Sequence, residues 1–122
     1  MTRRAIAIAF LEAAASGAVD DAYAQYVHPD FRHHNPHFPG SRSALIEGMK
    51  ESAVHFPHKD LHVLRTLEDG DLVAVHSRIT LAPGMPPFAL MHILRFEGDK
   101  IIEEWEVAQQ VPDDCPNDNG VF

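Results

Sequence analysis

Cysteine and basic residues are scarce in this chain of 122 residues, and each scarcity excludes a class of protein. Cys115 is the only cysteine, so no disulfide can form within the chain and no cysteine-rich zinc or iron–sulfur site can be built. A reducing, cytoplasmic location is therefore expected. Lysine and arginine total 10 against 18 aspartates and glutamates, for a net charge of −8. This balance opposes binding to nucleic acid or to an anionic membrane surface.

Long hydrophobic runs are also missing. The stretch Ala5–Leu11 follows two arginines and resembles the start of a secretory signal, but Glu12 interrupts it after seven residues. Ile6, Phe10 and Ala14 fall at helical spacing, which favours an ordinary amphipathic helix. Nothing approaches the ~20 apolar residues that a membrane span needs. We therefore expect one domain over residues 1–122, long enough to bury a core without disulfides or metal.

Helical patterns occupy the first half of the chain. Helices are predicted over Thr2–Ser16, from Asp20 to His28, and from Ser41 or Ser43 to Phe56, because acidic or hydroxyl residues precede them and Gly17, Pro29 and Pro57 follow. The third helix would bury Ile46, Met49, Ala53 and Phe56. A short strand is predicted over Asp30–Asn35, followed by a loop rich in proline.

Alternating patterns follow from Lys59 onward, separated by turn signals at regular intervals. Four strands are predicted, over Asp60–Leu67, Leu72–Leu81, Phe88–Phe96 and Lys100–Val111, as an antiparallel meander. Helices first and strands afterwards is the α+β pattern, in which helices cover one face of a curved antiparallel sheet. Both faces of Phe88–Phe96 carry apolar residues, so we expect the outer face to pair with a second copy in a symmetric homodimer.

Several ionisable residues occupy positions that the alternation places in the interior. His92 is in phase with Phe88 and Leu90, His76 is in phase with the apolar residues of its strand, and Glu104 and Glu106 share one side of the last strand. His34 lies at the end of the short early strand. One cavity could therefore receive imidazoles from three segments and carboxylates from a fourth. A lone histidine on such a strand is a core residue satisfied by one hydrogen bond about as often as it is a functional group.

The register of the last two strands decides whether these groups meet. A strict two-residue turn at Gly98-Asp99 pairs His92 with Trp105, which would separate His92 from the glutamates. A β-bulge would return them to one face. Glu103 and Glu104 are adjacent, so one of them is expected to point away, toward solvent.

Several segments together resemble a known family. They are Tyr26-Val27, His34-Asn35-Pro36, Asp71 to His76, Leu94-Arg95-Phe96, Glu104-Trp105-Glu106-Val107 and the ending from Gln110 to Phe122. In this order they look like the SnoaL-like polyketide cyclase family, part of the nuclear transport factor 2-like superfamily and related to ketosteroid isomerases. The resemblance implies a cone-shaped α+β barrel of three helices and a curved antiparallel sheet around an apolar pocket, commonly dimerising through the outer sheet face. It also implies a pocket carboxylate that moves a proton beside a carbonyl.

The resemblance and the chemistry together assign roles. A carboxylate buried in an apolar pocket has a pKa raised toward neutrality, as a base acting beside a carbonyl requires, and Glu106 is the expected base. His92 or His34 would donate a hydrogen bond to the enolate oxygen. The expected substrate-binding residues are Phe31, Phe56, His76, Phe88, Leu90 and Glu104. The hypothesis is an isomerase or lyase, cyclase-like and aldol-type, without a cofactor, acting on a small and largely apolar carbonyl compound.

Two alternatives remain. The same fold hosts binding proteins, so the pocket could belong to a non-catalytic small-molecule-binding or interaction module. A metal site built from His34, His76, His92 and Glu106 is chemically possible, although no local ligand spacing supports it.

Overall fold

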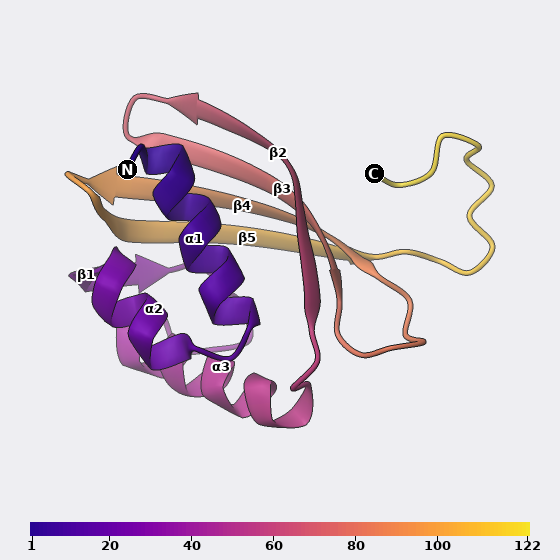
Figure 1. Ribbon diagram of the computed structural model, residues 1–122, viewed down its shortest axis with the longest axis horizontal. Coiled ribbons are helices and arrows are strands. Elements are labelled where there is room, and N and C mark those ends of the chain that lie inside the picture. Colours follow the sequence, from indigo (N-terminus) through magenta and orange to yellow (C-terminus); the bar gives the residue numbers. More distant parts are fainter.

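Three helices cover one face of a five-stranded sheet in the computed structural model, which describes residues 1–122 (Figure 1). The helices are α1 (Arg3–Ala15), α2 (Val19–Tyr26) and α3 (Arg42–His55). The strands are β1 (Val27–His33), β2 (Asp60–Asp69), β3 (Leu72–Thr80), β4 (Phe88–Glu97) and β5 (Lys100–Gln110). Residues 111–122 form an irregular tail that leaves the sheet after β5 (Figure 1). The α+β class and the helix-then-strand order are confirmed.

The strand order is β1-β5-β4-β3-β2. The last four strands form the predicted antiparallel meander, whereas β1 pairs with β5 in parallel, so the sheet is mixed. It does not close into a barrel, because β1 and β2 remain as its two edges. The first strand begins at Val27, earlier than expected, and contains Pro29, which an edge strand tolerates because one side of its backbone needs no ladder hydrogen bond.

Two of the three helices, α1 and α3, begin at side-chain caps, whereas α2 begins after Ala18 without one. Thr2 Oγ1 accepts a hydrogen bond from the Ala5 amide at 3.0 Å, and Ser41 Oγ accepts one from the Ala44 amide at 3.2 Å. Ser41 rather than Ser43 therefore caps α3. These bonds satisfy amide groups that have no partner inside the helix.

The buried side of α3 differs from the predicted stripe. Leu45 and Gly48 are its buried residues, while Ile46 and Met49 are only partly buried. The reason is a close approach at Gly48, where an added Cβ would lie 2.5 Å from Cε1 of the Phe38 ring. The loop before α3 thus packs on the helix through a position that periodicity assigns to solvent.

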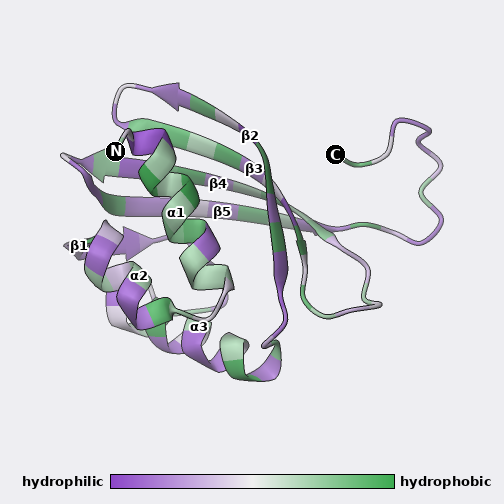
Figure 2. Cartoon of the chain, in the orientation of Figure 1, coloured by the Kyte–Doolittle hydropathy of each residue, from purple (hydrophilic) through white to green (hydrophobic).

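The core lies between the helices and the covered face of the sheet. Phe10 of α1, Tyr23 of α2 and Phe31 of β1 pack edge to face in sequence, with centroid distances of 5.3 and 6.0 Å. Val73 and Val75 of β3 complete this face and are fully buried. Figure 2 shows the hydrophobic residues concentrated on α1 and alternating along the strands. No helix has the length and apolar character needed to cross a bilayer.

A β-bulge interrupts the pairing of β4 with β5. Phe96 pairs with Ile101 and Arg95 pairs with Glu103, so Ile102 is an extra residue on β5. The bulge shifts every later pair by one position. The sequence left this point open, and the structure confirms the bulged alternative.

As a consequence, His92 lies opposite Glu106, and Leu94 lies opposite Glu104. Leu94 is fully buried beneath the helices, so all of these side chains belong to the covered face. Trp105 pairs with Ile93 and points to the outer face.

The cap of α3 can be tested by substitution. Ser41→Ala should lower the free energy of unfolding by about 1 kcal/mol, because the Ala44 amide loses its acceptor. Ser43→Ala, which removes a hydroxyl that caps no amide, should change stability by less than half as much. Urea denaturation of both variants measures the difference, and equal effects would contradict this assignment.

Candidate functional site

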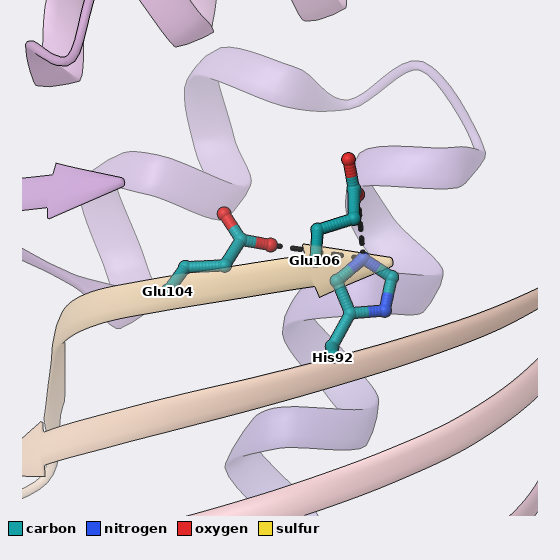
Figure 3. A group of neighbouring side chains, drawn as sticks. All are labelled: His92, Glu104 and Glu106. Carbon is teal, nitrogen blue, oxygen red and sulfur yellow. Dashed lines mark hydrogen bonds and ion pairs between the residues drawn. The ribbon is translucent and has the colours of Figure 1, made fainter. Parts of the chain in front are cut away.

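Three ionisable side chains converge on the covered face of the sheet (Figure 3). His92 Nε2 donates to Glu106 Oε2 at 2.8 Å and lies 3.7 Å from Glu104 Oε1. His92 and Glu104 are buried, whereas the Glu106 side chain keeps about a third of its surface exposed. We call these three residues, His92, Glu104 and Glu106, the acidic cluster. Glu106 is the member that an incoming molecule reaches most easily.

Asn35 holds the second oxygen of Glu106. Its Nδ2 donates to Glu106 Oε1 at 2.8 Å, and its Oδ1 accepts from the His37 amide at 2.9 Å, which fixes the orientation of the amide group. The Asn35 backbone amide donates to Nδ1 of buried His33, whose Nε2 donates to the Pro39 carbonyl at 2.7 Å. Sequence reasoning missed Asn35 as a site residue. Its place between the end of a strand and Pro36, where asparagine often bonds to the backbone two residues on, was the available signal.

Opposing effects set the charges of His92 and Glu106. Burial alone would lower the pKa of His92, but the hydrogen bond to Glu106 and the charges of Glu104 and Glu106 raise it above its usual value. Burial would raise the pKa of Glu106, but the hydrogen bond and charge of His92, and then the Asn35 hydrogen bond, lower it. The raised pKa expected for this carboxylate from the sequence is therefore wrong. Both shifts favour the charged forms, an imidazolium and a carboxylate. His92 Nδ1 is buried without a hydrogen-bond partner, so the bond from Nε2 to Glu106 is the one that holds the ring.

Glu104 behaves in the opposite way. Burial raises its pKa to about 7, with the charge of His92 acting against this shift and that of Glu106 adding to it. No protein group donates a hydrogen bond to its carboxyl group, and the contact with His92 is its nearest polar one. Near neutral pH this carboxyl group is therefore partly protonated and can donate a hydrogen bond.

The acidic cluster forms part of the wall of a cavity of about 380 Å³ between the helices and the sheet. This volume lies in the range of small-molecule sites. Thirteen of its 20 lining residues are hydrophobic. Phe88 and Leu90 line it, as predicted, and so do residues that were not predicted: Tyr23, Asn35, His37, Leu45, Met49, Ser52 and Lys59. Burial, followed by the charges of Glu104 and Glu106, raises the pKa of Tyr23, so its hydroxyl stays protonated.

Three predicted pocket residues lie elsewhere. His76 pairs with Met91 on the outer face, where it contacts Arg65, because the buried residues of β3 are the alternate set that includes Val75. Phe31 is a core residue that does not line the cavity. Phe56 lines a separate hollow beside Gly17, because α3 ends before it and directs the chain toward α1.

His34 also lies outside the cavity, in a cluster on the outer face. Its ring stacks on Trp105 at 5.1 Å, and its Nε2 donates to Glu103 Oε2 at 2.8 Å. Arg32 donates two hydrogen bonds to the same carboxylate, at 2.9 and 3.1 Å. The Arg32 bonds, and then that of His34, hold the pKa of Glu103 at about 2 although burial opposes them. Glu103 thus points away from the cavity, as expected, but it is buried in ion pairs rather than solvated.

The structure therefore separates the residues that had been grouped for a metal site. His34 and His76 are absent from the cavity, and the donor set that remains is His92 with Glu104 and Glu106, whose ligand atoms lie within 4.8 Å of one another. These three groups are the ones that could hold a divalent cation or share and transfer protons.

Fold and site together define an α+β pocket protein with a buried acidic cluster. The family model of the SnoaL-like domain matches residues 7–104, and the chain belongs to this family, as the resemblance predicted. No curated protein matches the chain.

Solved structures of low sequence identity share the fold. IdmH from Streptomyces antibioticus, a candidate polyketide cyclase, is 17% identical, with a TM-score of 0.74 over 89% of this chain and 93% of that one. A candidate polyketide cyclase from Acidithiobacillus ferrooxidans is 20% identical, with a TM-score of 0.74 over 88% and 89%. A candidate ketosteroid isomerase from Kribbella flavida is 20% identical, with a TM-score of 0.73 over 98% and 87%. At these identities the likeness shows the shared fold.

The raised pKa of Glu104 predicts that the free energy of unfolding depends on pH. The unfolded chain ionises this group near pH 4.5 and the folded protein only near pH 7, so its contribution to the free energy of unfolding falls as pH rises between these values. Glu104→Gln cannot ionise and should exceed the wild type in stability at pH 8 by on the order of 1 kcal/mol or more. The excess should disappear below about pH 4.5. Urea denaturation across this range checks it, and a difference independent of pH would contradict it.

Proposed function

We propose that this protein is a general acid/base catalyst that moves a proton next to the carbonyl group of a small, largely apolar compound, as an isomerase or an aldol-type lyase. One observation carries the proposal. Two carboxyl groups beside one buried histidine, in the wall of an apolar cavity, have pKa values shifted in opposite directions. Such a divergence is typical of an acid and a base that act on the same substrate.

Glu106 is the proposed base. It is ionised at neutral pH and accessible from the cavity, and each carboxylate oxygen retains a lone pair beyond its bond to His92 or Asn35. When it takes a proton from the carbon beside the carbonyl group, the C–H electron pair moves into the carbonyl group and an enolate forms. His92 Nε2 is occupied by its hydrogen bond to Glu106, so His92 is the positioning residue for Glu106.

Glu104 is the proposed acid. Its protonated carboxyl group can donate to the enolate oxygen, and a preorganised donor of this kind contributes a few kcal/mol to lowering a barrier. The Tyr23 hydroxyl lines the same cavity and remains protonated, so it is a second candidate donor. This assignment replaces His34, which lies on the other face of the sheet.

The fate of the enolate distinguishes the two reaction types. Return of the proton from Glu106 to a different carbon completes an isomerisation. Attack of the enolate carbon on a second carbonyl group of the same molecule forms a carbon–carbon bond and closes a ring. The apolar walls at Phe88 and Leu90 would favour a folded, water-free conformation for either step.

The base can be tested with aromatic and polycyclic ketones. Wild-type protein should catalyse exchange of their α-protons in D2O, followed by proton NMR. Glu106→Gln keeps the shape of the side chain and should slow exchange about a hundredfold or more. Glu12→Gln, on the exposed side of α1, is the matched control and should leave the rate unchanged.

Full exchange by Glu106→Gln would overturn this assignment. Binding of ketones by wild-type protein with no exchange above the buffer rate would instead favour a non-catalytic binding module. Repeating the exchange with EDTA and with added zinc chloride tests whether a divalent cation takes part.

We further propose that the outer face of the sheet pairs with a second copy of the chain. Four apolar residues of this face expose between 38% and 73% of their surface: Leu67 on β2, Met91 and Ile93 on β4, and Val107 on β5. Contiguous apolar surface of this kind is unusual on a monomer. A two-fold axis through the face would cover it with an identical patch.

A charge on this face should therefore prevent association. Val107→Asp should convert a dimer to a monomer in sedimentation velocity, because an unpaired carboxylate would be buried between the copies. Val54→Asp introduces the same charge at another largely exposed valine, on α3, and should leave the dimer intact. A monomeric wild-type protein would refute the pairing.

A further inference from the structure

The cavity contains one cation of fixed charge. Lys59 is the only lysine or arginine among its lining residues, and its Nζ donates to Ser52 Oγ, also in the wall, at 2.7 Å. It lies in the short connection between α3 and β2 (Figure 1). Lys59 is partly buried, and burial lowers its pKa, as expected for a cation without a neighbouring anion.

Unlike Lys50, Lys59 has no acidic partner, and unlike Lys100 it lies in the cavity wall. Lys50 pairs with Asp20 at 3.1 Å, and Lys100 donates to the Gln25 carbonyl at the surface. No carboxylate lies within ion-pair distance of Lys59, although the chain has 18 aspartates and glutamates. A partly desolvated ammonium group facing an apolar cavity is costly unless an anion completes its coordination.

Lys59 and the acidic cluster occupy different regions of the cavity. Lys59 lies two residues before Leu61. Leu61 of β2 pairs with Ile79 of β3, which in turn pairs with Phe88 of β4, so Lys59 is near the Phe88 end of β4. His92 is four residues farther along β4, which is about 13 Å at the usual rise of a strand. The cavity therefore has a basic end and an acidic end, separated by apolar walls.

We propose that Lys59, with Ser52, binds an anionic group of the ligand, so that the substrate class is carbonyl compounds bearing a carboxylate or similar acid far from the reacting carbon. The carbonyl part of this statement rests on the proposed function, and the anionic part does not. The part-exposed carboxylate of Glu106 disfavours an anion at its own end, and Lys59 favours one at the opposite end. Electrostatics alone thus selects the orientation that presents the carbonyl group to Glu106.

A purely structural role for Lys59 predicts a different result. Its aliphatic stem could cover the cavity wall while Nζ bonds to Ser52 only. Lys59→Met keeps the length and apolar character of the stem and removes the charge. Lys59→Arg keeps the charge.

The test uses 6-acetyl-2-naphthoate, whose ketone and carboxylate stand at opposite ends of a rigid ring system, and its uncharged methyl ester. Calorimetry at pH 7 should show that wild-type protein binds the acid about tenfold or more tightly than the ester. Lys59→Met should abolish this preference by weakening binding of the acid alone, and Lys59→Arg should retain it. Lys50→Met, outside the cavity, is the control and should retain it as well.

Equal affinity of wild-type protein for acid and ester would overturn the proposal, as would a Lys59→Met variant that keeps the preference or loses both ligands equally. Proton exchange at the acetyl group, measured separately, keeps this result distinct from the proposed catalysis. A selective acid preference without exchange would leave the anion site standing and remove the acid/base function.

Discussion

A single extra residue, Ile102, determines which face of the sheet carries the acidic groups. Side chains alternate along a strand, so without the bulge Glu104 would lie opposite Ile93 on the outer face and Glu103 would turn inward. With it, both Glu104 and Glu106 meet His92 beneath the helices. The cavity, its charge distribution and the arrangement of the outer face all follow from this one insertion.

Two consecutive glutamates show how strongly the face decides the chemistry. Glu103 and Glu104 are equally buried, yet their pKa values lie at about 2 and about 7. Glu103 receives hydrogen bonds from Arg32 and His34, which favour its charged form. Glu104 receives none, so desolvation dominates. The protein thus fixes one carboxylate as a structural anion and leaves the next poised to exchange a proton at neutral pH.

Local patterns were enough to predict most of the fold. Hydrophobic period, glycine and proline located every helix and strand, because these signals act within a few residues. Facing was harder. Both sides of β3 carry apolar residues, so alternation could not show that Val75 rather than His76 points inward. Asn35 and Lys59 lie in connections, where no periodicity exists, and they reach the cavity only through the three-dimensional packing of α3.

Net charge accounts for the combination of groups in the cavity. With His92 protonated, Glu106 ionised and Glu104 neutral, the acidic cluster carries no net charge, which is the state that a low-dielectric site favours. In the proposed reaction Glu106 gains a proton from carbon while Glu104 gives one toward oxygen. The substrate therefore passes to a neutral enol rather than a free enolate, while the negative charge moves from Glu106 to Glu104 within the cluster. A single buried carboxylate could not do this, because the charge it gave up would move onto the enolate oxygen.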